Sequence, residues 1–250
     1  MGLKITFSDA RLWRYIMSAV GKFIEIGSLH VSESGLSFKA MDPSRTSLTE
    51  FIIPREAFDE FDAEGEHKLI LNIEDVSKIL RTAEKDDKIS IEWTESSITF
   101  IFERRGVPRS FTLPLQTAVE AEEIPELSLD LKNAYKISGT VLYESIKGIE
   151  DVGDVLRIEG NEQRLSLKSI SDMGEAEVIL DVERGTLEET EVNNPGFSVA
   201  YSIEYFSYMK QPIKLADYIY LRADSDMPCH LELNYMQGAK FNYYVAPRVE

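Results

Sequence analysis

The amino-acid sequence repeats its own order of elements at a nearly constant spacing. A helix-forming segment opens at Ser8 and another at Ser138, and the alternating run GLSFKA at 35–40 has its counterpart RLSLKS at 164–169. Further pairs of segments keep the same offset of about 129 residues, which is the signature of an internal duplication. A chain built this way is constrained to fold as two similar halves.

Four segments show the periodicity of amphipathic helices. In the first, Trp13, Ile16, Met17 and Val20 recur at i, i+3, i+4 and i+7. Polar residues suited to capping stand at the starts, among them Ser8, Asp9, Asn72 and Ser202. The fourth segment is predicted to stop at Pro212. The segments are 9–22, 73–85, 139–150 and 202–211.

Short alternating runs rich in β-branched and aromatic residues fill most of the remaining chain. Many such strands with few helices predict an α+β fold dominated by antiparallel sheet, with two strand–helix–strand units in each half. An acidic stretch around Pro125 without strand alternation predicts a connector between domains. The alternative is a long surface loop within one domain. The expected division is 1–116, a connecting loop 117–128, and 129–250.

The net charge is −17, from 27 basic and 44 acidic residues, yet the basic residues gather in the helices. Taken as far as residue 214, the four helical segments carry slightly more basic than acidic residues, so the rest of the chain is strongly acidic. Lys78, Arg81 and Lys85 fall at i, i+3 and i+7, opposite the apolar stripe. This pattern fits a surface that faces a polyanion through phosphate contacts. An ordinary solvated helix face is the alternative.

The sequence offers no recognisable catalytic motif. Phosphate-loop, dinucleotide-binding, nucleophile-elbow and zinc-protease patterns are all missing, and the three histidines are far apart. Cys229 is the only cysteine, which fits a reducing compartment and excludes a disulfide scaffold. We expect no signal peptide, no membrane span, no metal and no cofactor, and a cytoplasmic binding protein rather than an enzyme.

Particular motifs sharpen this interpretation. The chain resembles the archaeal sliding clamps of the proliferating cell nuclear antigen family from end to end, with the landmarks in the right order. The resemblance rests on KAMDPSRTSLTEF (39–51), IEDVSKILRTAEKDDKISI (73–91), GVPRSFTLPL (106–115), EIPEL (123–127) and YYVAPRVE (243–250).

The resemblance implies a βαβββ unit used twice in each domain and a ring of three subunits. Helices would line a channel around duplex DNA, and the protein would be a processivity factor without catalysis of its own. It would tether DNA polymerase, the clamp loader, flap endonuclease and DNA ligase for replication and repair. The implied channel cations are Arg11, Arg14, Lys78, Arg81, Lys147, Lys210 and Lys214.

Two further sets of residues follow from the resemblance. Partner proteins would dock a peptide of the form Q-x-x-aliphatic-x-x-aromatic-aromatic on Met41, Arg45, Thr46, Leu48, Glu123, Ile124, Pro125, Leu127, Pro228, Tyr244, Ala246 and Pro247. The subunit contact would join the strands near 108–115 and 175–181, through Arg109, Ser110, Phe111, Thr112, Glu144, Glu177, Val178 and Ile179, with Arg109 and Glu144 as a charged pair.

The third helix departs from the family pattern, because Lys147 is its only basic residue and stands among Glu144 and Glu150. Tyr15 also occupies a place where many relatives have a basic residue. The ring could therefore be a homotrimer or a heterotrimer with paralogous subunits. The sequence is also compatible with a checkpoint-type clamp subunit, with an enzyme whose carboxylate site is built from distant loops, and with an acidic assembly protein that does not bind DNA.

Overall fold

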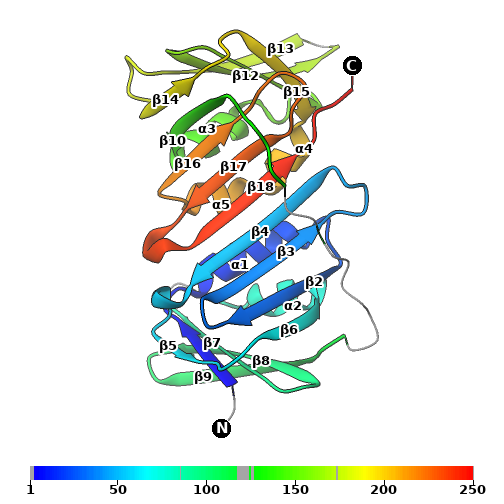
Figure 1. Ribbon diagram of the computed structural model, residues 1–250, viewed down its shortest axis with the longest axis vertical. Coiled ribbons are helices and arrows are strands. Elements are labelled where there is room, and N and C mark those ends of the chain that lie inside the picture. Colours follow the sequence, from blue (N-terminus) through cyan, green and yellow to red (C-terminus); the bar gives the residue numbers. More distant parts are fainter. Residues whose placement is uncertain (1–2, 85, 117–123, 125–126, 173, 250) are drawn as a thin grey trace. The chain divides into compact units, whose positions relative to one another are not determined.

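The computed structural model describes residues 3–84, 86–116, 124, 127–172 and 174–249. The chain divides into two compact units (Figure 1). The first comprises Met1–Pro43, Thr49–Pro125 and Gln237–Lys240, and the second comprises Ser44–Leu48, Glu126–Met236 and Phe241–Glu250. Each unit therefore includes a short segment from the other half of the sequence. The predicted boundaries at 116 and 129 stay predictions, since most of the residues between them lie outside the described part.

The first half of the chain follows a strand–helix–strand order twice. Its elements are β1 (Leu3–Phe7), α1 (Ala10–Val20), β2 (Ile26–Ser32), β3 (Gly35–Met41), β4 (Ser47–Pro54), the short helix η1 (Arg55–Ala57), β5 (Glu60–Asp62), β6 (His67–Asn72), α2 (Ile73–Leu80), β7 (Lys88–Trp93), β8 (Ser97–Arg104) and β9 (Val107–Pro114).

The second half repeats this order with an extra break in its last helix. Its elements are β10 (Asn133–Ser138), α3 (Gly139–Ile149), β11 (Val155–Gly160), β12 (Arg164–Ser171), β13 (Gly174–Asp181), β14 (Glu189–Val192), β15 (Phe197–Ser202), α4 (Ile203–Tyr208), α5 (Lys210–Leu215), β16 (Tyr218–Arg222), β17 (Cys229–Asn234), η2 (Met236–Gly238) and β18 (Lys240–Val245).

The duplication predicted from the sequence is confirmed by these bounds. Helix α1 begins at Ala10 and α3 at Gly139, while β3 begins at Gly35 and β12 at Arg164, so both pairs keep the expected offset. The strand pairs, such as β1–β7, β12–β13 and β8–β9, are antiparallel. The α+β class and the repeated βαβββ unit are therefore confirmed, with the short strands β5 and β14 added to the pattern.

Each unit contains two groups of neighbouring strands. In the first, the five-stranded sheet has the order β5-β1-β7-β8-β9, and β4-β3-β2-β6 follow one another in the second group. In the second unit, the corresponding orders are β13-β12-β11-β15 and β14-β10-β16-β17-β18. Strands β9 and β13 thus each lie at one end of a sheet.

The helices form where the sequence provides both an apolar stripe and a cap. The carboxylate of Asp9 accepts a hydrogen bond from the backbone of Arg11, and the Asn72 side chain does the same for Asp75 at the start of α2. Trp13, Ile16 and Met17 of α1 are buried, and the ring of Trp13 meets that of Phe51 on β4. Helix α1 lies beside β3 and β4 (Figure 1). Each of these helices therefore buries its apolar face in the core and exposes its polar face to solvent.

The prediction that Pro212 ends the fourth helix is wrong. The helix breaks at Met209, where φ is −86° and ψ is 0°, and a second short helix, α5, continues to Leu215. Pro212 lies in the first turn of α5. A proline is tolerated there because the backbone N–H groups of a first turn have no partner within the helix.

Candidate functional site

The solvent face of α1 and α2 carries four of the predicted channel cations, and two of them are paired locally. Arg11 makes a two-pronged contact with Asp9, with Nε and Nη2 at 3.0 and 2.8 Å from its carboxylate oxygens. Hydrogen bonding to Asp9 raises the pKa of Arg11. Lys78 lies 2.7 Å from Glu74 and 3.4 Å from Asp75. These two cations are therefore largely neutralised within their own helix turns.

Arg14 and Arg81 differ from those two residues. The Nη1 atom of Arg14 donates a 2.7 Å hydrogen bond to the carbonyl of Ala83, which links α1 to the chain after α2. The Arg14 guanidinium also lies over the ring of Tyr15. Arg81 is exposed at the C-terminal end of α2, and among the described residues it makes no ion pair within 4.0 Å. Arg81 is the cation of this helix pair whose charge is most available to a phosphate.

In the second unit, two of the predicted channel cations contact the ring of one tyrosine, Tyr143. The ammonium groups of Lys147 on α3 and Lys214 on α5 lie 5.8 and 4.7 Å from the centre of the Tyr143 ring. Lys147 also lies 3.8 Å from Glu144, and Lys210 forms an ion pair with Glu150. Lys214 is thus held by cation–π contact without an acidic partner among the described residues. Tyr143 was missed by sequence reasoning, although its i, i+4 spacing to Lys147 was a usable signal.

The residues predicted at the subunit contact lie on two terminal strands. Ser110 and Thr112 are exposed on β9, and Phe111 points to the other face, where its ring meets Phe102. On β13, Glu177 and Ile179 are exposed while Val178 is partly covered. The predicted charged pair already has partners within the chain. Arg109 contacts Asp87, and Glu144 contacts Lys147.

The structure brings several of the predicted peptide-binding residues together in the second unit. The backbone N–H of Ala246 donates a 2.7 Å hydrogen bond to the carbonyl of Thr46, so the segment 44–48 runs beside the end of β18. Arg45 adopts a left-handed backbone conformation, with φ at 57°. Leu48 is buried, and Pro247 and Pro228 are half-buried.

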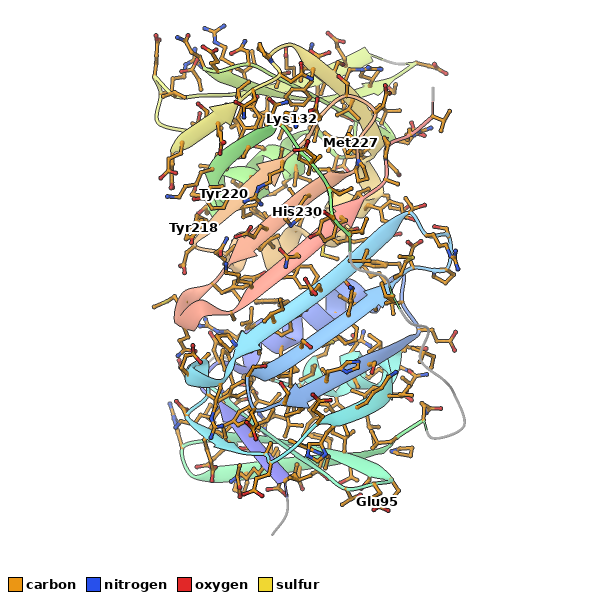
Figure 2. The ribbon with its side chains drawn as sticks, viewed as in Figure 1. Glu95, Lys132, Tyr218, Tyr220, Met227 and His230 are labelled. Carbon is orange, nitrogen blue, oxygen red and sulfur yellow. The ribbon has the colours of Figure 1, made fainter. Side chains whose placement is uncertain are left out.

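Tyr244 has a neighbour that the sequence did not single out. The ring of His230 stacks on it, with centroids 4.3 Å apart and planes within 7°. His230 lies on the face of β17 opposite to the buried Leu231, and Figure 2 labels it on that face. Its Nε2 lies 3.1 Å from the Asn242 side-chain oxygen, and its Nδ1 lies 3.4 Å from an Arg222 nitrogen.

The other predicted peptide-binding residues are divided between the units or lie outside the described part. Met41 and Ile124 belong to the first unit, and Leu127 is exposed in the second. Glu123 and Pro125 lie outside the described residues. Within the described ranges, no three His, Cys, Asp or Glu side chains gather as possible metal ligands. No helix in those ranges is long and apolar enough to cross a membrane.

Comparison with known proteins accounts for this arrangement. Residues 2–117 match the family model for the N-terminal domain of proliferating cell nuclear antigen. The "DNA polymerase sliding clamp 3" of Aeropyrum pernix is 31% identical over 245 residues, which is 98% of this chain and 97% of that protein. This chain belongs to the proliferating cell nuclear antigen family of sliding clamps. The "DNA polymerase sliding clamp" of Pyrococcus horikoshii, 28% identical, is matched over the full length of both chains.

Solved structures agree with the family assignment. The chain superposes with a TM-score of 0.91 on a protein of the PCNA2–PCNA3 complex from Sulfolobus tokodaii, at 30% identity over 99% of this chain and 100% of that one. PCNA from Thermococcus kodakaraensis gives a TM-score of 0.89 at 22% identity and shares the fold, over 98% of this chain and 100% of that one. The sliding-clamp fold predicted from the sequence is therefore confirmed.

Proposed function

We propose that this protein is a DNA polymerase sliding clamp, a ring subunit that encircles duplex DNA and carries no catalytic activity of its own. The observation that carries the proposal is the full-length match to relatives named as sliding clamps, in a chain whose helices bury one face and hold cations on the other. The ring would retain DNA by topology, so weak phosphate contacts would be sufficient and would permit sliding.

The proposed DNA contacts are unequal. Arg81 and Lys214 are exposed without an acidic partner among the described residues, whereas Arg11, Lys78, Lys147 and Lys210 each have one. A cation that already neutralises a carboxylate attracts a phosphate less strongly. We expect sequence-independent binding that is weak and strongly reduced by salt.

Topological retention gives the sharpest test of the proposal. The purified chain would be loaded by a clamp loader onto nicked circular DNA, and then separated from free protein by gel filtration. Retention on the circle and loss after a single cut in the DNA support a sliding ring. Retention that survives linearisation would contradict it, because a protein bound by direct contacts does not slide off a free end.

The partners are proposed to dock through a short peptide with an aromatic pair. Support comes from the segment 44–48, Tyr244 and Ala246, which lie together at the end of β18. Small and apolar side chains suit an aromatic anchor, and the neighbouring backbone suits an extended peptide. DNA polymerase, the clamp loader, flap endonuclease and DNA ligase are the expected owners of such peptides, and peptides from each would be titrated against the chain.

A ring of different subunits is the second candidate, because one of the similar structures is a complex of two clamp proteins. Light scattering of the purified chain across a concentration series distinguishes a homotrimer from a ring of different subunits. A species near three times the chain mass of 28.4 kDa favours a homotrimer. A persistent monomer or dimer favours a mixed ring.

A further inference from the structure

The segment 44–48, which belongs to the proposed peptide-docking site, is held from two sides. On one side, the backbone N–H of Ala246 donates to the carbonyl of Thr46 at 2.7 Å. On the other side, the hydroxyl of Tyr205 on α4 lies 3.3 Å from the hydroxyl oxygen of Ser44. Tyr205 is far from the segment in the sequence, and no motif of the chain assigns it a role. The contact therefore adds a residue of α4 to the surroundings of the docking site.

The direction of the hydrogen bonds between these hydroxyl groups can be assigned. The Ser44 hydroxyl donates to Thr46 Oγ1 at 2.9 Å. A serine hydroxyl carries a single hydrogen, so the Ser44 oxygen must accept from Tyr205. The bonds thus run from Tyr205 through Ser44 to Thr46, and each donor polarises the next one. Removal of the Tyr205 hydroxyl takes away the donor with which this chain of bonds begins.

Helix α4 offers a fixed support for this contact. Ile203 and Phe206 of α4 are buried. The carbonyl of Tyr205 accepts a 3.2 Å hydrogen bond from the hydroxyl of Tyr243, a buried residue of β18. Successive residues of a strand point to opposite faces, so the next residue, Tyr244, points away from α4. Tyr205 is therefore fixed at its backbone by the same strand that carries a predicted docking residue.

The backbone of the segment needs such support. Arg45 is exposed and has φ at 57°, a left-handed conformation that is unfavourable for a residue with a side chain. Without contacts to hold it, this part of the chain would relax to other conformations, and a partner's peptide would have to order it on binding. Anchors on both sides keep the docking conformation populated before a peptide arrives.

We propose that Tyr205 is a positioning residue for peptide docking, whose hydroxyl holds the segment 44–48 in the conformation that receives a partner's peptide. This inference deepens the proposed function and rests on it. In this role Tyr205 acts through Ser44 and Thr46 and does not itself contact the peptide. Its loss leaves the segment with more conformational freedom, which the bound state must then restrict.

Peptide affinity in Tyr205→Phe is the first test, because this variant keeps the ring and removes only the hydroxyl. We expect the dissociation constant for a peptide carrying the aromatic pair to rise about two- to tenfold, the usual effect of one hydrogen bond. Tyr208→Phe is the matched control, since Tyr208 lies on the same helix and its hydroxyl donates to Glu204 of that helix. An unchanged affinity in Tyr205→Phe, or an equal loss in Tyr208→Phe, would overturn the proposal.

A double-mutant cycle with Ser44→Ala tests whether the two hydroxyl groups act as a unit. Both substitutions interrupt the same chain of hydrogen bonds, so we expect the double variant to bind no more weakly than Ser44→Ala alone. Losses that simply add would show that the two groups act independently and would contradict the assigned chain. The urea midpoint of Tyr205→Phe should equal that of the wild-type chain. A fall in the midpoint that accounts for the lost affinity would indicate a general structural role instead.

Trypsin cleavage after Arg45, followed by mass spectrometry, reports on the segment in the absence of any peptide. A segment that is held less firmly is cleaved faster. We expect faster cleavage in Tyr205→Phe than in the wild-type chain and in Tyr208→Phe. If cleavage is faster but the wild-type chain binds no peptide, the contact with the segment stands and the proposed docking fails. If the wild-type chain binds peptide and Tyr205→Phe matches it in both measurements, docking stands and Tyr205 has no positioning role.

Discussion

The guanidinium of Arg109 on β9 donates to the carboxylate of Asp87, just before β7, at 2.5 Å. Asp87 is 1% exposed, and the same carboxylate oxygen also accepts from the backbone N–H of Glu84 at 2.8 Å. The carbonyl of Asp87 accepts from the N–H of Ala10, at the start of α1. The arginine predicted to bind a neighbouring subunit thus also stabilises the fold of its own unit.

Arg109→Met is therefore expected to lower the free energy of unfolding by about 1–3 kcal/mol, because it removes a donor from a buried carboxylate. Urea denaturation measures the change. Arg105→Met is the matched control, since Arg105 is exposed in the adjacent turn and should leave stability unchanged. Equal stability of both variants would contradict the structural role. Arg109→Glu would place two carboxylates together, so loss of the ring in that variant would not by itself report on the interface.

Arg81→Ala is expected to weaken DNA binding more than Lys78→Ala, because Lys78 is already paired with Glu74 and Asp75. The measurement is the DNA-binding constant at a series of salt concentrations. Loss of one phosphate contact reduces the slope of the logarithm of the binding constant against the logarithm of the salt concentration by about 0.9 in magnitude. Glu74→Gln should strengthen binding, because it removes the closer of the two acidic partners of Lys78. Equal losses for the two alanine variants would show that the ion pairs on α2 do not control the contact. Unchanged light-scattering mass serves as the control for assembly.

His230 is expected to make the protein less stable in mild acid. Burial, together with the nearby Arg222, lowers the pKa of His230 below its ordinary 6.5, although Asn242 and Glu232 act in the opposite direction. The folded state then binds the proton less readily than the unfolded state. The contribution of His230 to the free energy of unfolding is therefore fully present above pH 6.5, and it decreases as the pH falls below that value.

His230→Phe keeps a flat ring against Tyr244 and removes the titration, so its melting temperature should depend less on pH below 6.5. His30, whose pKa is also lowered by burial, leaves a residual slope in both proteins. Peptide affinity measured over the same pH range would show whether the stacked pair positions Tyr244. If the melting temperatures of the two proteins depended on pH in the same way, titration of His230 would not contribute to the loss of stability in acid.

Ala246→Pro should reduce peptide binding, because it removes the N–H that donates to the Thr46 carbonyl at 2.7 Å. The segment 44–48 would lose its link to the end of β18. Ala246→Gly retains the N–H and serves as the control. Calorimetric titration with a peptide carrying the aromatic pair is the measurement. If the proline variant bound as tightly as the glycine variant, this hydrogen bond would have no role in the docking site.

The repeat, the helices and the strand class were predictable from the sequence because they depend on local periodicity. The apolar stripe of α1 and the caps at Asp9 and Asn72 are each read within a few residues, and the structure confirms them. The family assignment likewise needed only short motifs in the right order. The course of the chain at Pro212 was mispredicted, because a proline is compatible with the first turn of a new helix as well as with the end of an old one.

Tertiary structure alone decided which charges are available and which backbone groups face outward. Lys210 meets Glu150 and Arg109 meets Asp87 across long separations in the chain, and no periodicity reports such contacts. The same holds for His230 on Tyr244. The sequence shows Pro108 and Pro114, but only the register against β8 reveals that their missing N–H groups lie on the outer edge. Local pattern sets what each segment can form, whereas distant packing sets which of its polar groups remain unpaired.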